Sequence, residues 1–331
     1  MNVDNRICVI GTYFGKLPNY FPLWLKTAAY NPTIDFYIFT DQQFEQRFPN
    51  IFRIGITLED MRKRSSKAMG FEVSLKTPYK CCDYKPVYGL IFADYIQKYD
   101  YWAHTDFDMM YGDLQSFADR YDLYQYDKFL PLGHLSFYRN TEECNHHFMK
   151  SIEGSGMDYK MVFTQERCFG FDEQPKRGLI AIYTQNQLPF MKKKLYVDID
   201  KYLHRYCQSP LCFEQEEMVN YEQQVFYWEK GKVYRAWSEG RAIHREEYIY
   251  IHFQHRPNYA LTFDPETIDA FYITNKGFIP KTGGVTQEDI HALNPYRGAL
   301  YEAVERKFKY YRNRYKKAIQ RRLESRRRSA G

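Results

Sequence analysis

The N-terminal part of the chain alternates between two apolar segments and one amphipathic segment, and this order constrains the fold most strongly. RICVIGTYF and IDFYIFTD are apolar and rich in residues that favour strands. Between them lies LPNYFPLWLKTAAYNP, which has helical spacing and stops at an Asn-Pro pair. A strand–helix–strand unit of this kind is typical of a right-handed parallel crossover. The sequence therefore predicts an α/β fold with a mixed, mostly parallel sheet flanked by helices.

Later segments continue this pattern. IFRIGI and YWAHTDFD predict two further strands, and KCCDYKPVYGLIFADYIQKY between them predicts the strongest helix of the first half. KFLPLGHLSFYRN predicts two short strands, and NTEECNHHFMKSI predicts a helix. Short strands are predicted near LIAIYT and KLYVDID, and KVYRAW, RAIHR and EYIYIHFQHR predict β-structure that returns to the sheet. We expect one domain over residues 1–295 and a C-terminal helical tail over residues 296–331.

Two aspartates, Asp106 and Asp108, stand at the end of the predicted strand YWAHTDFD. Residues i and i+2 of a strand face the same side, so both carboxylates can face one ion while Phe107 turns into the core. Ligands of open α/β sheets gather at the carboxyl ends of the strands. Mn²⁺ and Mg²⁺ prefer carboxylate oxygens and commonly share their ligand shell with phosphates. The pair therefore predicts a metal–diphosphate site, and the alternative is two loop aspartates that cap the following turn.

The cysteines and the hydropathy pattern bear on the compartment. The seven cysteines are scattered without CxxC spacing, which argues against a zinc site or a disulfide framework and fits a reducing compartment. The N-terminus, MNVDNRICVIG, has only a short apolar run and no small-residue cleavage site. No window approaches the ~18 apolar residues that a spanning helix needs. We therefore expect a cytoplasmic protein.

The positive charge of the chain is concentrated at its C-terminal end. Residues 301–331 hold twelve Lys and Arg against three Glu, whereas the whole chain has a net charge of +6. Apolar residues recur there at spacings of three and four: Leu300, Val304, Phe308, Tyr311, Tyr315, Ile319 and Leu323. A basic amphipathic helix of this kind suits an anionic membrane surface. The alternatives are packing of the stripe on the protein body and binding of nucleic acid; no RNA-binding fold signature supports the latter, so no nucleic-acid partner is expected.

Several separated motifs appear in a characteristic order: GTYFGKLPNYFPLWLKTAAYNPTIDFYIFTD, CCDYKPVYGLIF, YDYWAHTDFDMMYGDLQSF, GHLSFYRN, GFDE and YIHFQHR. Together they resemble a bacterial family of GT-A-fold glycosyltransferases from surface-polysaccharide (capsule or O-antigen) gene clusters. The resemblance runs from about Ile7 to Arg256. It implies a GT-A-like, Rossmann-related fold, a nucleotide-sugar donor that is usually UDP-linked, Mn²⁺ or Mg²⁺, and a glycan or lipid-linked glycan acceptor. Some members are galactofuranosyltransferases, so a galactofuranosyl donor is one alternative.

The resemblance also implies a metal-binding set. Asp106 and Asp108 match the family's Asp-x-Asp motif, with Asp108 as the more direct ligand and Asp106 sharing the metal or binding the ribose. His252 in YIHFQH matches a late histidine that completes the metal shell, and a neutral imidazole beside two carboxylates is suitable for Mn²⁺. The alternative for His252 is a core or surface histidine on a strand. His255 and Arg256 lie close by in sequence and are candidates for a phosphate contact.

Donor-binding residues are expected after the first two strands and at the start of the helix that precedes the Asp-x-Asp strand. Thr12, Tyr13 and Phe14 follow the first strand, where GT-A folds hold base and ribose, and Tyr13 is a candidate to stack on uracil. Asp41 is a candidate hydrogen-bond acceptor for base or sugar, with a helix cap as the alternative. Lys85 in CDYKP is the candidate cation for the diphosphate leaving group.

Acceptor-side residues are expected in GFDEQ, which resembles the acidic motif of inverting GT-A enzymes. Inversion needs a carboxylate that takes the proton of the acceptor hydroxyl. Asp172 is the first candidate for this base and Glu173 the second, with a solvated acidic loop as the alternative. His134 and Arg139 are candidates to line the sugar or acceptor pocket. Asp83 is expected to orient Lys85 or to cap the adjacent helix.

The leading hypothesis is a metal-dependent, inverting glycosyltransferase that is attached peripherally to the inner face of the cytoplasmic membrane; a retaining enzyme would use GFDE to bind the donor sugar. A nucleotide-sugar pyrophosphorylase or hydrolase is a second hypothesis, because it would also use Asp-x-Asp on an α/β sheet. Pyrophosphorylases carry a Gly-rich loop with basic residues after the first strand, and GTYFGKLPN matches that poorly. A non-catalytic, membrane-associated scaffold of the same fold is the third.

Overall fold

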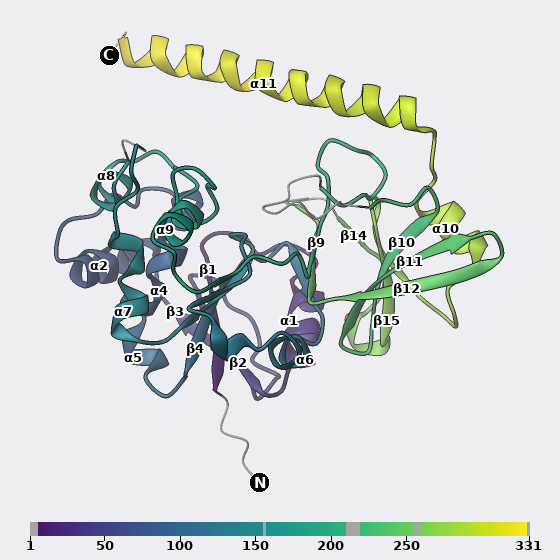
Figure 1. The fold of residues 1–331 in the computed structure, drawn as a ribbon, viewed down its shortest axis with the longest axis horizontal. Coiled ribbons are helices and arrows are strands. Elements are labelled where there is room, and N and C mark those ends of the chain that lie inside the picture. Colours follow the sequence, from purple (N-terminus) through teal and green to yellow (C-terminus); the bar gives the residue numbers. More distant parts are fainter. Residues whose placement is uncertain (1–5, 155–156, 210–218, 255–258, 330–331) are drawn as a thin grey trace.

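A seven-stranded mixed sheet forms the centre of the N-terminal half of the chain (Figure 1). This computed structural model describes residues 6–154, 157–209, 219–254 and 259–329. The sheet order is β3-β2-β1-β4-β7-β6-β8. The strands are β1 Ile7–Tyr13, β2 Ile34–Thr40, β3 Ile51–Gly55, β4 Tyr101–Thr105, β6 Lys128–Phe129, β7 Leu135–Arg139 and β8 Phe190–Met191. β3, β2, β1 and β4 run parallel and β7 runs antiparallel to β4, so the predicted mixed, mostly parallel sheet is confirmed.

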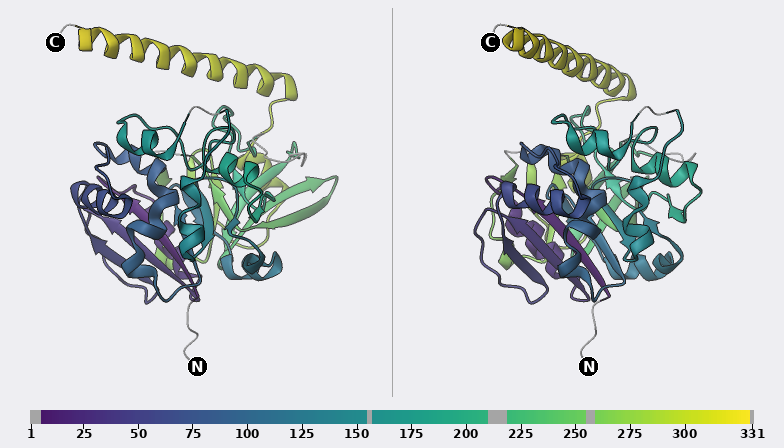
Figure 2. Two further views of the ribbon diagram at one scale, coloured as in Figure 1. Left: turned by 60° about the vertical axis from the view of Figure 1, so that its left-hand side comes forward. Right: turned by 90° about the vertical axis from the view of Figure 1, so that its left-hand side faces the viewer.

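Helices cover both faces of this sheet, so its central strands are buried on both sides (Figure 2). Along β1, Ile7 and Val9 enter one core cluster while Cys8 and Ile10 enter the other, as the two-residue period of a strand requires. The first cluster includes residues of α1 (Phe21–Ala29) and α6 (Leu114–Arg120). The second includes residues of α2 (Leu58–Met69), α7 (Glu142–Asn145), α8 (Tyr159–Thr164) and α9 (Leu179–Gln185).

The prediction of one continuous helix for KCCDYKPVYGLIFADYIQKY is wrong. The segment is a chain of short helical turns: η1 Pro78–Lys80, α3 Cys81–Tyr84, η2 Lys85–Val87, α4 Tyr88–Ile91 and α5 Ala93–Ile96. Pro86 lies in the middle, and proline has no N–H for the helical hydrogen bond. NTEECNHHFMKSI is helical in two pieces, α7 and η4 (His147–Met149).

Two other expectations about local structure also differ. LIAIYT was predicted as a strand but forms α9, with Leu179, Ala181, Ile182 and Tyr183 in the core. A short apolar run fits a buried helix as well as a strand. The sequence analysis missed α2, although Thr57 and Asp60 form a capping box at its start.

A second, six-stranded sheet is formed by the C-terminal half (Figure 1). Its order is β12-β11-β10-β15-β16-β14, with β10 Gln224–Glu229, β11 Lys232–Glu239, β12 Ala242–Tyr248, β14 Ala260–Leu261, β15 Ala270–Thr274 and β16 Gly277–Pro280. The strands predicted for KVYRAW and RAIHR exist as β11 and β12, but they do not return to the first sheet. They pair with their sequence neighbours through tight hairpins, and α10 (Gln287–Leu293) packs against one face.

A small three-stranded sheet joins segments that lie far apart in the sequence. β13 (Tyr250–His252) pairs antiparallel with β5 (Met109–Tyr111) and parallel with β9 (Val197–Asp198). β5 begins directly after the Asp-x-Asp motif. The pairing therefore brings the ends of β4, β9 and β13 together.

The predicted C-terminal helix is present as α11, Ala299–Ser329, which extends above the rest of the molecule in Figure 1. Among the residues that the structure describes, no helix has both the length and the apolar character needed to cross a membrane.

Candidate metal and carboxylate site

The turn between β4 and β5 holds Asp106 and Asp108 around a buried aromatic residue. The Phe107 ring stacks on Trp24 with a centroid distance of 4.8 Å. Gly11 of β1 provides the space, because a Cβ atom there would lie 2.6 Å from the Phe107 ring. The two aspartates lie at the carboxyl end of β4, as predicted. Their proximity comes from this anchored turn and not from alternation within a strand.

His252 at the end of β13 faces the same turn. Its Nε2 atom lies 3.3 Å from Asp108 Oδ1, and its Nδ1 atom lies 2.8 Å from Asp198 Oδ1. One ligand atom each from Asp106, Asp108 and His252 lies within 4.8 Å of the others. The structure thus brings together the three residues that the sequence analysis selected for a metal.

The protonation of these groups follows from their neighbours. Burial alone would lower the pKa of His252, but Asp108 and Asp198 raise it to about 10. Burial also opposes ionisation of Asp108, yet the attraction of His252 holds the pKa of Asp108 below its usual value. The result is an imidazolium between two carboxylates.

This donor set fits a divalent cation such as Mn²⁺. Carboxylate oxygens suit hard divalent ions, and an imidazole nitrogen adds a ligand that Mn²⁺ accepts. Ligation by His252 requires its Nε2 atom to give up a proton, as histidine ligands generally do. Asp106, Asp108 and His252 are the residues that would hold the ion.

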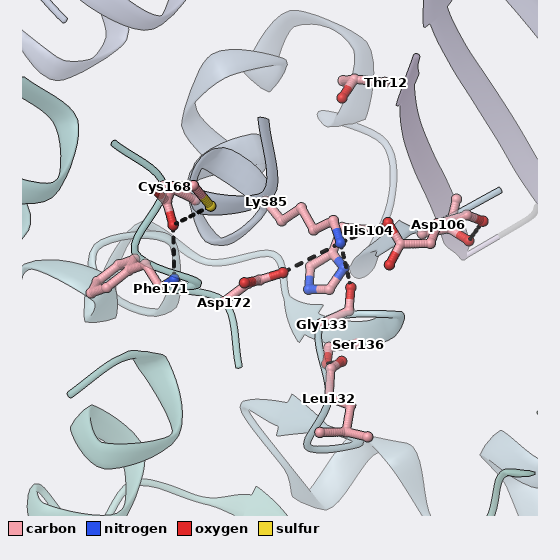
Figure 3. Close-up of polar contacts among 12 residues, drawn as sticks. Thr12, Lys85, His104, Asp106, Leu132, Gly133, Ser136, Cys168, Phe171 and Asp172 are labelled. Atoms are coloured by element: carbon pink, nitrogen blue, oxygen red, sulfur yellow. Dashed lines mark hydrogen bonds and ion pairs between the residues drawn. The ribbon is translucent and has the colours of Figure 1, made fainter. Parts of the chain in front are cut away.

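Lys85 connects the metal-binding turn to a second carboxylate (Figure 3). Its Nζ atom lies 2.7 Å from Asp106 Oδ1, 3.3 Å from Asp172 Oδ2 and 2.8 Å from the carbonyl oxygen of Gly133. Although burial opposes the charge, Asp106 and Asp172 raise the pKa of Lys85 well above its usual value. An ammonium group has three N–H donors, and all three have acceptors here. A direct contact of Lys85 with a diphosphate would require one of these bonds to break.

Asp172 is buried, whereas much of the neighbouring Glu173 side chain is exposed, although burial of its carboxyl group raises the pKa of Glu173. Burial raises the pKa of Asp172 to about 7, against the attraction of Lys85. The Asp172 carboxylate also packs against Gly133, where an added Cβ atom would lie 2.3 Å from Asp172 Oδ2. Any larger residue at position 133 would displace the carboxylate, so glycine is part of how the site is built.

Asp83 holds the loop that carries Asp172. Its carboxylate accepts hydrogen bonds from the backbone N–H groups of Phe169, at 2.9 Å, and Phe171, at 2.8 Å. It also pairs with the buried Lys80 at 2.7 Å. The two roles expected of Asp83, orienting Lys85 or capping a helix, are therefore wrong: Asp83 fixes the GFDE loop instead. A buried carboxylate with these partners is fully compensated.

The end of β1 lies beside the metal-binding turn, and Thr12 and Tyr13 belong to this strand instead of following it as expected. The Tyr13 ring contacts Phe107 edge to face at 5.2 Å, and Thr12 Oγ1 lies 2.6 Å from Tyr88 Oη. Phe14 is buried in the core cluster around α2, so its ring is not open to a nucleotide in this structure. Asp41 accepts a hydrogen bond from Gly15 N at 3.0 Å and holds the turn after β1. A role in donor binding stays a prediction for these four residues.

His134 lies directly against the metal-binding residues. Its ring centroid is 3.5 Å from that of His252, and its carbonyl oxygen accepts a hydrogen bond from Asp106 N at 2.8 Å. Arg139 pairs with Asp127 beside Tyr101, at the opposite end of β4 from the site. His255 and Arg256 lie outside the described residues.

Comparison with known proteins places the chain in a family. Residues 9–282 match the model of a family of unknown function, DUF6625. The chain belongs to this family. No curated protein matches the sequence. One solved structure that matches is galactosyltransferase LgtC in complex with donor and acceptor sugar analogs, at 13% identity and a TM-score of 0.34, covering 58% of this chain and 75% of that chain. At this TM-score the similarity carries no argument, and the function of this DUF6625 member is inferred from its site.

Sequence analysis of this family member missed Asp198, which touches His252. The segment KLYVDID was considered only as a strand. Its Asp198 and Asp200 repeat the spacing of Asp106 and Asp108 at the end of another strand, and this was the available signal. The contact itself depends on the pairing of β9 with β13, which no local pattern predicts.

Proposed function

We propose that this chain is a metal-dependent glycosyltransferase that moves a sugar from a nucleotide donor, with UDP as the first candidate, to a glycan or lipid-linked glycan in bacterial surface-polysaccharide synthesis. The observation that supports it most is the convergence of Asp106, Asp108 and His252 beside a buried carboxylate, Asp172. Lys85 joins the two parts. Burial raises the pKa of Asp172 to about 7, and perturbed pKa values of this kind cluster at functional sites.

The proposed reaction is a single displacement. Asp172 is 3% exposed, so binding of the acceptor has to open a path to its carboxylate. Asp172 then accepts the proton of the acceptor hydroxyl as that oxygen bonds to the anomeric carbon and the bond from this carbon to the diphosphate breaks. A base with a pKa near 7 suits this proton transfer at neutral pH. A divalent ion bound by Asp106, Asp108 and His252 would stabilise the negative charge on the departing diphosphate. Lys85 holds Asp106 and Asp172 at fixed positions relative to each other.

A screen of nucleotide-sugars tests this proposal. The full chain is incubated with Mn²⁺ or Mg²⁺ and single UDP-sugars, including UDP-galactopyranose and UDP-galactofuranose, and release of UDP is measured with and without a mixture of glycan acceptors. We expect metal-dependent release of UDP from one donor, accelerated by acceptor. Release that acceptor never accelerates would favour a hydrolase. No release, together with no metal-dependent thermal stabilisation by UDP, would favour a non-catalytic scaffold.

The proposal includes attachment to the anionic inner face of the cytoplasmic membrane through α11. The apolar stripe of this helix does not pack on the protein body: its described members are between 41% and 80% exposed, namely Leu300, Val304, Phe308, Tyr311, Tyr315 and Ile319. The side chain of Leu323 lies outside the described set. Acidic groups of the helix instead face the body, where Glu302 pairs with Arg205 at 2.6 Å. Arg306 of the helix pairs with Asp200 at 2.9 Å.

The separation of outward apolar side chains from body-facing ion pairs in α11 suits a helix that lies at a membrane surface, which needs an exposed apolar face and basic flanks. The outward face carries apolar side chains, and exposed basic residues such as Lys307, Arg312 and Lys316 flank them. Apolar burial at the lipid boundary and attraction to anionic headgroups then act together. The ion pairs at the start of α11 would fix the direction in which the stripe faces.

Changing Phe308, Tyr311 and Tyr315 together to glutamine should release the protein from anionic vesicles. Glutamine preserves helix propensity but removes apolar area that is worth about 1.5–3 kcal/mol per fully buried side chain. We expect the apparent affinity for phosphatidylglycerol vesicles in a sedimentation assay to fall at least about tenfold. Tyr79→Gln, at an exposed tyrosine outside α11, is the control and should bind as the wild type does. Equal sedimentation of the triple variant would refute membrane attachment by the stripe.

A further inference from the structure

Asp198 is a buried carboxylate that is hydrogen-bonded to His252, the histidine of the candidate metal site. It is 3% exposed and lies opposite His252 in the register of β9 and β13. Its Oδ1 atom accepts hydrogen bonds from His252 Nδ1 and from Gln254 Nε2, both at 2.8 Å. Neither the proposed reaction nor the family assignment gives this residue a role.

The hydrogen bond decides which nitrogen of His252 is available to an ion. An ionised carboxylate can only accept, so the Nδ1 atom of His252 must be the donor. The lone pair of the neutral ring is then on Nε2, the atom that lies 3.3 Å from Asp108. Without a fixed acceptor at Nδ1, the neutral imidazole could place its proton on either nitrogen.

Asp198 could instead be considered a ligand, because His134, Asp198 and His252 form a second group of closely spaced donor atoms. The geometry disfavours this. Asp198 Oδ1 already accepts two hydrogen bonds, while His134 Nε2 is 4.0 Å from it. The rings of His134 and His252 lie nearly face to face, with centroids 3.5 Å apart and planes inclined by 30°. Lone pairs in such planes do not converge well on one ion.

The backbone around Asp198 holds the carboxylate firmly. Ile199 N donates to the carbonyl oxygen of His252 at 2.9 Å, and Ser209 N donates to that of Asp198 at 2.6 Å. Gln254 has a φ of 62°, a left-handed conformation that is unfavourable for a residue with a side chain. Strain of this kind persists where surrounding contacts over-determine the structure, and it is concentrated at functional sites.

We infer that Asp198 is a positioning residue: it fixes the tautomer and ring orientation of His252 so that Nε2 is presented to a divalent cation at Asp106 and Asp108. The inference rests on the proposed metal-dependent function. Carboxylate–histidine–metal arrangements of this type contribute strongly to metal affinity, although the carboxylate does not touch the ion.

Binding of Mn²⁺ to the full chain tests the inference without any assay of activity. Free Mn²⁺ is measured by electron paramagnetic resonance, and Ca²⁺ affinity is measured by competition. Asp198→Ala should raise the Kd for Mn²⁺ by about 10- to 100-fold. It should raise the Kd for Ca²⁺ less, because Ca²⁺ relies on oxygen ligands. Asp198→Asn retains an acceptor oxygen for the Nδ1–H group and should lie between wild type and alanine, which also covers the case in which the alanine variant does not fold.

Asp200→Asn is the matched control, since this second buried carboxylate of the segment pairs with Arg306 and not with His252. It should leave both affinities unchanged. If wild type binds Mn²⁺, Asp108→Ala does not, and the folded Asp198 variants bind as tightly as wild type, the positioning role is refuted while the metal site stands. If wild type itself binds no Mn²⁺, both the positioning role and the metal-dependent function are refuted. A loss of equal size for both ions would indicate general damage to the site and would also refute the assigned role.

Discussion

Replacing Asp108 by alanine should abolish metal-dependent sugar transfer while leaving the fold intact. The carboxylate is the partner of His252 at 3.3 Å and is held ionised, so its removal takes a charged oxygen ligand from the ion. Metal stabilisation of a leaving group is worth several kcal/mol, so we expect turnover to fall by at least about 10³-fold. The structural contact of residue 108 is made by its backbone oxygen, which accepts from Phe253 N at 3.1 Å and is retained in alanine.

The control for this variant is Asp119→Asn, an exposed acid on α6 that should transfer sugar as the wild type does. Thermal unfolding and circular dichroism of Asp108→Ala should resemble those of wild type without metal. The stabilisation that Mn²⁺ and UDP together give the wild type should be absent from the variant. A folded Asp108→Ala protein with full activity would contradict the metal assignment.

Replacing Asp172 by asparagine should remove the acceptor base and the acid limb of the pH profile. Burial raises the pKa of Asp172 to about 7, and only the ionised carboxylate can accept a proton. In the wild type, kcat/KM should therefore rise with pH up to about 7 and level off above it. Loss of a general base costs about 10²- to 10⁴-fold in rate. Asparagine is isosteric and can still accept from Lys85, so the ion-pair network should lose charge but keep its shape.

Glu173→Gln provides the comparison, because burial also raises the pKa of this neighbouring acid but Glu173 has no ion pair with Lys85 among the described contacts. We expect kcat/KM of the Glu173→Gln variant to rise with pH up to about 7, as in the wild type. If Glu173→Gln loses the limb and Asp172→Asn keeps it, the base is Glu173. If both variants retain full kcat and the same profile, the transfer uses no base from GFDE, and the inverting mechanism proposed here is wrong.

The parts of the fold that were predictable are those specified by short-range patterns. Both faces of β1 and β2 are buried, so their continuous apolar runs identified them as central strands of a parallel sheet. The aspartates after β4 were assigned correctly to a strand end. The broken helix at residues 78–96 and the helix α9 were predicted wrongly, because Pro86 interrupts one and an apolar run is ambiguous in the other.

The unpredictable parts of the candidate site depend on contacts between distant segments. Asp198 reaches His252 only because β9 and β13 pair, and Asp83 reaches Phe169 and Phe171 across a separation of more than eighty residues. Lys85 was recognised as a cation near the site, but its three acceptors come from three separate loops. Local spacing carries information on which residues are chemically suited to a site. It carries little on which of them bind one another.

The position of a divalent ion is the most direct test of the central proposal. Crystals grown with Mn²⁺ and UDP can be measured at a wavelength where manganese scatters anomalously. We predict one strong anomalous peak within coordination distance of Asp108 and His252, with diphosphate oxygens completing the ligand shell. A nucleotide bound elsewhere, or a peak that none of Asp106, Asp108 and His252 approaches, would contradict the proposed function.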